Sequence, residues 1–303
     1  MLRRLALGSL ALLLLLALAL GLLLARNSRT PSPTDFSTST LLQTPPPPLS
    51  QEITLKAVTF NVHDLRIVSE HRPERMKAIA AALAKLDPDI VGFQEAFIET
   101  DRAILLQGLE ATRLKYHQYF PSGSVGSGLL VSSAYPIAEH YFFRYTQGGV
   151  WYRVWHGDWW AGKGIALARI ALPAGGYLDF YNTHAHASYG VKEYESIRLS
   201  NMQEVLPFID QTATKSSPII IAGDFNCRVG TEQYAALRVD EILQRTLDGD
   251  TGVDHLFAYK SKGYTFELLK SDVIEEMFPV EGGESELSDH AGHMATIRIT
   301  PTS

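Results

Sequence analysis

Several polar residues stand directly after apolar runs of the chain, where strands are expected to end. In the stretch IIIAGDFN (219–226), Asp224 and Asn226 lie two residues apart behind three isoleucines. If the backbone stays extended here, both side chains share one face and can reach one ligand. The full set of such residues is Asn61, Glu95, His184, Asp224, Asn226, Asp254, Asp289 and His290.

This set combines two imidazoles, four carboxylates and two amides. Oxygen ligands of this kind suit Mg²⁺, with Mn²⁺ as an alternative. Imidazoles can take up or release a proton near neutral pH. A single motif is weak because Asp and Asn also mark ordinary turns. The chemistry therefore depends on a fold that brings the strand ends together.

The elements that must position these residues can be predicted from hydrophobic periodicity. Strands are predicted over 53–62, 90–95, 126–133, 163–172, 177–187, 218–226, 253–259 and 288–299, and helices over 73–86, 101–114, 191–213 and 231–237. Each strand is expected to deliver its polar residues at its carboxyl end or just beyond. Several strands follow one another directly, so we predict an α+β fold with two mixed sheets and outer helices.

The motifs FN, QE, NTH, GDFN, VDH and SDH occur in this order and span residues 53–298. In this order they resemble the endonuclease/exonuclease/phosphatase superfamily. The resemblance implies a four-layer α/β/β/α sandwich and metal-dependent hydrolysis of a phosphate ester. It places the catalytic domain at residues 51–303.

The resemblance also implies a set of metal ligands. Glu95 with Asn61 is expected to hold Mg²⁺ against a phosphate oxygen, and Asp289 to support the metal or its waters. His184 and His186 share a face if THAH stays extended, but no further ligand spacing supports a zinc site.

The other matched residues are expected to perform acid–base and electrostatic catalysis. His290 accepts a proton from the attacking water, and Asp254 orients its imidazole. Asp224 and Asn226 position the water and the phosphate. His184 donates to the phosphate as negative charge develops.

The stretch GDWWAGKG (157–164) nearly matches a phosphate-binding P-loop. Gly164 stands where that motif needs Ser or Thr, and the apolar run that follows is strand-like rather than helical. The Lys-Gly pair at this place is similar to the neutral sphingomyelinase branch of the superfamily. In that branch Lys163 is expected to bind the substrate phosphate or to close a loop.

All four tryptophans of the chain lie in residues 141–160. One interpretation is a packed hairpin that buries at least half of these aromatic residues. The other is an aromatic loop at the mouth of the site, in which Trp151 and Trp155 contact a lipid substrate or its headgroups. The sequence favours neither.

Composition limits the range of partners. With 46% hydrophobic residues among 303, the chain can bury a sizeable core. Residues 50–303 carry 23 basic and 32 acidic side chains, a poor surface for attracting nucleic acid. The single cysteine, Cys227, excludes an internal disulfide and is expected to be buried. Nothing in the sequence indicates a protein partner.

The first 50 residues differ from the rest. Residues 5–25 carry no charge and are flanked by arginines, which predicts a membrane anchor with the domain outside the cytoplasm, or alternatively a cleaved export signal. Residues 26–50 are rich in Pro, Ser and Thr and are predicted to be a disordered linker.

Together these features predict an exported, anchored, Mg²⁺-dependent phosphodiesterase that acts on a sphingomyelin-like membrane lipid, as a phospholipase C does. The alternatives are an exported metal-dependent nuclease acting on DNA or RNA and, less favoured, a phosphomonoesterase. A degenerate, non-catalytic binding module is a third class, but Glu95, Asp224 and His290 are all present.

Overall fold

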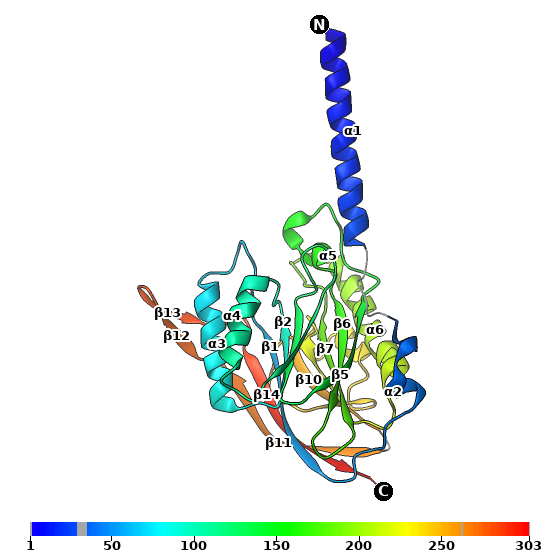
Figure 1. Cartoon of the computed structure of the whole chain (residues 1–303), viewed down its shortest axis with the longest axis vertical. Coiled ribbons are helices and arrows are strands. Elements are labelled where there is room, and N and C mark those ends of the chain that lie inside the picture. Colours follow the sequence, from blue (N-terminus) through cyan, green and yellow to red (C-terminus); the bar gives the residue numbers. More distant parts are fainter. Residues whose placement is uncertain (1, 29–34, 262, 303) are drawn as a thin grey trace.

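In the computed structural model, which describes residues 2–28, 35–261 and 263–302, two six-stranded mixed sheets pack face to face (Figure 1). The first sheet has the order β11 (Tyr264–Ile274), β14 (Gly292–Pro301), β1 (Ile53–Asn61), β2 (Ile90–Gln94), β4 (Leu129–Ser133) and β3 (Tyr116–Phe120). The second has the order β5 (Ile137–Arg144), β6 (Gly164–Ala171), β7 (Tyr177–His184), β8 (Ile219–Asp224), β10 (Asp254–Tyr259) and β9 (Leu243–Arg245).

Helices cover the outer face of each sheet. Helices α3 (Arg72–Leu86) and α4 (Glu99–Leu109) pack on the first sheet, and α6 (Tyr194–Thr212) packs on the second. A central apolar cluster fills the space between the sheets. This arrangement is the predicted α/β/β/α sandwich, so the predicted fold is confirmed.

The strands next to the site are apolar on both faces because each lies between two layers. On β1, Leu55 faces the opposite sheet, whereas Phe60 packs with the helices. On β8, Ile220 faces the opposite sheet, and Ile219 and Ile221 pack against the α6 side. The three consecutive isoleucines therefore pack into two different apolar clusters, one on each face of the sheet.

The predicted helices are present with somewhat shorter bounds at α4 and α6. Strands β3, β5, β9 and β11 were not predicted, because turns and polar residues interrupt their apolar pattern. Within the sandwich domain the structure also has the helices η2 (Val154–His156), α5 (Asp158–Ala161) and α7 (Glu232–Ala236), and a two-stranded hairpin, β12 (Met277–Val280) with β13 (Gly283–Glu286).

The N-terminal helix α1 (Leu2–Asn27) projects away from the sandwich (Figure 1). Its segment Gly8–Asn27 has a mean hydropathy of 2.6, and none of the window is buried. Length and composition are therefore sufficient for this helix to cross a membrane.

Part of the predicted disordered linker is in fact packed on the domain. Residues 29–34 lie outside the described residues, but η1 (Phe36–Thr38) and α2 (Thr40–Gln43) follow them. Ser39 Oγ donates to Glu139 at 2.6 Å, and the Leu49 amide donates to the Tyr264 hydroxyl at 2.9 Å. The prediction of disorder is thus wrong for residues 35–50, because their partners lie far along the chain.

Candidate active site

The predicted site residues meet at one edge of the sandwich. Asn61 ends β1 and pairs with Gln94, the last residue of the parallel strand β2. His184 ends β7 and pairs with Asp224, the last residue of the parallel strand β8. The carboxyl ends of one parallel pair from each sheet therefore lie together, and we call this the active-site edge.

The remaining residues reach the same edge by a different route. Asp254 is the first residue of β10, not the last, and it pairs with Asp224 because β10 runs antiparallel to β8. His290 and Asp289 precede β14, which runs antiparallel to β1. The prediction that every strand delivers its polar residue at the carboxyl end is wrong for these three.

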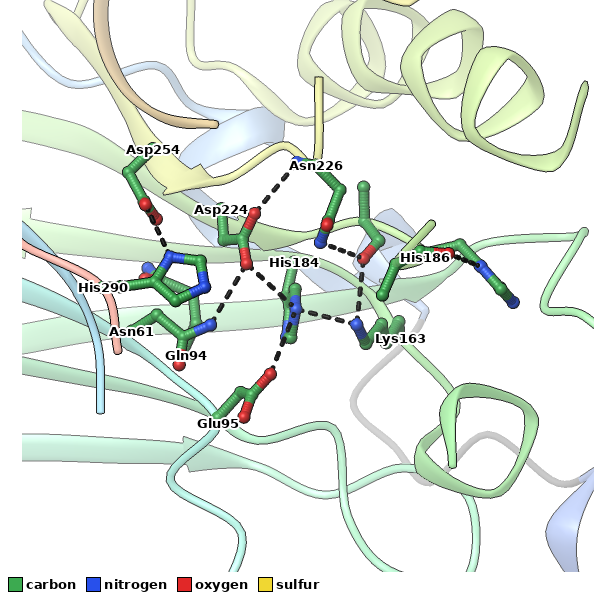
Figure 2. Close-up of polar contacts among 12 residues, drawn as sticks. Asn61, Gln94, Glu95, Lys163, His184, His186, Asp224, Asn226, Asp254 and His290 are labelled. Carbon is green, nitrogen blue, oxygen red and sulfur yellow. Dashed lines mark hydrogen bonds and ion pairs between the residues drawn. The ribbon is translucent and has the colours of Figure 1, made fainter. Parts of the chain in front are cut away.

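Asp224 is the centre of the polar network (Figure 2). Asn61 Nδ2 donates to Asp224 Oδ2 at 3.1 Å, and His184 Nε2 lies 3.3 Å from the same oxygen. Burial opposes the charge of Asp224, but His184 and the nearby His290 and Lys163 hold the pKa of this carboxyl well below its usual range. Asp224 is therefore a carboxylate at neutral pH.

The structure corrects the predicted geometry of Asn226. Strand β8 ends at Asp224, and Asn226 adopts a left-handed backbone with φ of 49°. Its backbone N–H donates to Asp224 Oδ1 at 2.9 Å, and its side-chain Nδ2 donates to the Ala185 carbonyl at 3.1 Å. Asn226 thus closes a turn beside Asp224 and does not share an extended face with it.

His290, which is partly exposed, forms a hydrogen-bonded pair with the buried Asp254. His290 Nδ1 lies 2.7 Å from Asp254 Oδ2. Burial lowers the pKa of His290, but the hydrogen bond to Asp254 and the surrounding carboxylates raise it to about 10. Burial and the charge of Asp224 raise the pKa of Asp254. The carboxylates around His290 therefore favour its protonated form.

Glu95 follows β2 with a left-handed backbone, φ of 56°, which is uncommon for a residue with a side chain. Its Oε1 lies 3.8 Å from His184 Nε2. Its Oε2 is buried and has no hydrogen-bond partner, and the same is true of Asp254 Oδ1. Buried carboxylate oxygens without a partner are costly, unless a ligand completes them.

The donor set fits a divalent cation. Ligand atoms of Asp224, Asp254 and His290 all lie within 4.8 Å of one another, and Glu95 contributes an unpaired oxygen nearby. Mg²⁺ and Mn²⁺ prefer carboxylate oxygens of this kind. Asp289, predicted to support the metal, lies at the rim with a side chain 55% exposed and Oδ1 3.5 Å from His63 Nδ1.

Lys163 lies behind His184. Its Nζ is 2.7 Å from His184 Nε2, donates to the Ala185 carbonyl at 3.0 Å and pairs with Asp158 Oδ1 at 3.0 Å. An ammonium can only donate, so these three contacts use all three of its hydrogens and make His184 Nε2 an acceptor in this structure. Because Asp158 belongs to the segment before β6, the contacts favour the loop-closing role over direct phosphate binding.

Sequence reasoning missed two polar partners of this network. Asp158 accepts from the Ala187 amide and the Tyr189 hydroxyl in addition to pairing with Lys163. Gln94 Nε2 donates to Asn182 Oδ1 at 2.7 Å and so connects the two sheets beneath the site. Both residues belong to motifs noted in the sequence, Asp158 to GDWW and Gln94 to QE. Their place in these motifs was the only sequence feature that could have indicated a role at the site.

The other histidines near the site have structural partners. The His186 ring packs on Tyr194, with centroids 4.3 Å apart, and Nδ1 lies 2.7 Å from the Ala187 carbonyl. His255 Nε2 donates to the Cys227 carbonyl at 2.8 Å. Cys227 is buried, as predicted, and burial raises the pKa of its thiol to about 12, so the thiol stays protonated at neutral pH.

The tryptophans divide into two groups. Trp159 and Trp160, in α5, are partly buried and contact each other edge to face at 4.9 Å. Trp151 and Trp155, in the segment between β5 and α5, are exposed. The packed-hairpin interpretation therefore holds for half of the set, and two tryptophans are left free to contact a ligand or a surface.

The fold and the site define the class of this protein. Residues 58–290 match the model of the Endonuclease/Exonuclease/phosphatase family, and the chain belongs to that family.

Individual relatives narrow the comparison. The chain is 30% identical over 275 residues to a putative neutral sphingomyelinase of Drosophila melanogaster, covering 81% of this chain and 61% of that protein. It is 37% identical over 174 residues to an inositol phosphosphingolipids phospholipase C of Schizosaccharomyces pombe, covering 57% and 41%. The chain thus spans less than two thirds of the length of these relatives.

Solved structures share the fold. Sphingomyelinase C from Streptomyces griseocarneus superposes with a TM-score of 0.62 at 17% identity, covering 80% of this chain and 99% of that one. A beta toxin variant from Staphylococcus aureus with bound magnesium ions gives 0.60 at 20% identity, covering 80% and 99%.

Proposed function

We propose that this chain is a Mg²⁺-dependent phosphodiesterase that hydrolyses a sphingomyelin-like membrane lipid in the manner of a phospholipase C. The observation that carries the proposal is the hydrogen-bonded His290–Asp254 pair beside Asp224, at an edge where Glu95 Oε2 and Asp254 Oδ1 have no partner. The lipid part is supported by the named activities of the curated relatives.

Glu95, Asp224 and Asp254 would hold the cation, with Asn61 close by and Asp289 at the rim. Bound there, a divalent cation supplies Lewis acidity toward a phosphate oxygen and a positive charge that opposes protonation of His290. Mn²⁺ is the alternative ion.

The chain's own residues supply the rest of the chemistry. Neutral His290 accepts the proton of the attacking water at Nε2, while Asp254 holds Nδ1–H and fixes the ring. His184 is proposed to donate toward the phosphate from Nε2 as negative charge develops, and this requires the Lys163 ammonium, which lies 2.7 Å from Nε2, to move off that nitrogen when substrate binds. Asn61 and the Asn226 amide hold Asp224 in place for this arrangement.

We also propose that α1 remains as an anchor and that the domain lies outside the cytoplasm. The unburied apolar surface of α1 supports the anchor. The acidic balance of residues 50–303 favours lipid over nucleic acid as substrate.

The test uses the full chain in detergent, with and without Mg²⁺, on sphingomyelin vesicles and on plasmid DNA. We expect phosphocholine release that needs Mg²⁺ and that falls about 10²–10⁴-fold in His290→Ala. His117→Ala, on β3, is the matched control and should retain activity. Nicked DNA with intact lipid would transfer the site to a nuclease, and full activity of His290→Ala would refute the mechanism.

A further inference from the structure

The end of α1 is held tightly against the active-site edge. Asn27, the last residue of the helix, is fully buried. Its Nδ2 donates to the Trp159 carbonyl at 2.8 Å, its Oδ1 accepts from the Ser124 amide at 2.7 Å, and the Arg144 guanidinium donates to its carbonyl. The helix therefore leaves the domain from a defined place and not from a loose tether.

Exposed apolar side chains gather beside this attachment. The segment between β5 and α5 exposes Trp151, Tyr152, Val154 and Trp155, the last with 76% of its surface accessible. The segment is held at its base, where the His156 ring stacks on Tyr189 at 4.5 Å and its Nδ1 lies 2.7 Å from the Tyr194 hydroxyl. The apolar residues are thus presented outward from a well-supported base.

A second loop presents apolar residues on the other side of the site. Residues 62–71 follow β1 and expose Ile67 at 96% and Val68 at 63%. Ser69 Oγ accepts from the Leu65 amide at 2.9 Å, and Arg75 donates to the His63 carbonyl at 2.6 Å, so this loop is also braced. In Figure 1 this loop and the α5 segment extend from the domain on the side from which α1 leaves.

We propose that α1 and these two loops engage one lipid bilayer, so that the active-site edge lies against the membrane in which the chain's own helix is embedded. A helix of this length and hydropathy can span the bilayer. Trp and Tyr prefer the interface region, and clustered exposed apolar residues mark a contact surface. The Asn27 contacts set the orientation. The choice of a membrane lipid as substrate rests on the proposed function.

The first test measures contact without using activity. The full chain carries Ile67→Cys labelled with a fluorophore and is reconstituted into dilute vesicles of brominated phosphatidylcholine, whose bromine quenches on contact. Cys227 is buried and does not compete for the label. The matched control is Tyr116→Cys, an exposed position far from the active-site edge. Tyr116 pairs with Ser133, which pairs with Ile90 at the start of β2, whereas the active-site edge lies at the other end of that strand.

We expect strong quenching at position 67, little at position 116, and a loss of most of the quenching at 67 when Asn27→Ala is added. Equal quenching at both positions, or none at 67, would overturn the proposal. Quenching at 67 that Asn27→Ala leaves unchanged would overturn the orienting role of α1. If quenching at position 67 is absent and the fluorophore becomes shielded only as the protein concentration rises, a second copy of the chain covers this surface instead.

The second test separates this orientation from the activity itself. Vesicles that contain the protein and isotope-labelled sphingomyelin are mixed with protein-free vesicles of unlabelled sphingomyelin. We expect labelled phosphocholine to exceed unlabelled by at least tenfold, and Asn27→Ala to reduce this ratio while turnover in detergent micelles is kept. Equal release from both populations overturns the proposal. No release even in micelles contradicts the proposed function, and the quenching result still decides the orientation.

Discussion

At the residue scale, the buried ammonium of Lys163 contacts both His184 and Asp158. Lys163 and Asp158 are both nearly inaccessible and lie 3.0 Å apart, and the charge of Lys163 helps to keep Asp158 ionised despite its burial. Removing one partner of such a pair leaves an uncompensated charge in a low-dielectric environment. The pair therefore holds the segment before β6 against His184.

Asp158→Asn removes this counter-charge with little change of shape. We expect the free energy of unfolding to fall by about 3–5 kcal/mol and activity to fall with it, because His184 loses a firmly placed neighbour. Denaturant unfolding measures the first effect. Glu276→Gln is the control, since its pair with Lys85 is exposed and should be worth less than about 1 kcal/mol. Equal losses in the two variants would contradict the prediction.

At the scale of elements, the contact between β7 and β8 decides whether the site forms. Their parallel register places His184 opposite Asp224. Gly223 allows the close approach, because a Cβ at this position would lie 2.3 Å from the Thr183 carbonyl oxygen and 2.6 Å from its Cγ2. The Thr183 carbonyl belongs to the backbone of β7, so it cannot move away from a new Cβ as the end of a flexible side chain could.

Gly223→Ala should push β8 away from β7 and move Asp224 relative to His184. We expect a loss of about 1–3 kcal/mol in stability from overpacking. Activity should fall by as much as about 10²-fold, since displacements near 1 Å can have that effect. Turnover and denaturant unfolding of the same preparation test both parts. Gly263→Ala meets no atom within 4 Å and should change neither; a silent Gly223→Ala would show that the strands can separate freely.

At the scale of the whole molecule, buried histidines link stability to pH. His293, on β14, is buried, and burial together with the charges of His255 and His290 lowers its pKa to about 4. The unfolded chain takes up this proton near pH 6.5. Between these values the unfolded state binds more protons, so this contribution to stability is present above about pH 6.5 and is lost as the pH falls toward 4.

His293→Gln should therefore flatten the acid side of the stability profile. We expect the difference in unfolding free energy between the variant and the unmodified chain to change by at most about 1.4 kcal/mol per pH unit between pH 6.5 and 4.5. His290 is present in both proteins, so its opposite contribution to the pH dependence cancels in this difference. Unfolding curves at several pH values give the result, and parallel profiles would contradict it.

The sequence by itself determined the layer architecture and the residue types of the site. Apolar runs such as 219–222 are local, and so are the polar residues that end them, so periodicity and motif order were enough to predict strands, helices and a hydrolytic edge. Composition also describes only the local sequence. It therefore predicted disorder for residues 35–50, which are ordered by contacts with Glu139 and Tyr264 far along the chain.

Only the tertiary structure decided which of these residues touch. The turn at Asn226, the antiparallel entry of Asp254, the Lys163–Asp158 support and the attachment of Asn27 to Trp159 all join positions that no local pattern relates. Their physical reason is the packing of two sheets, which selects one register and one set of buried partners among many that the same residue types would allow.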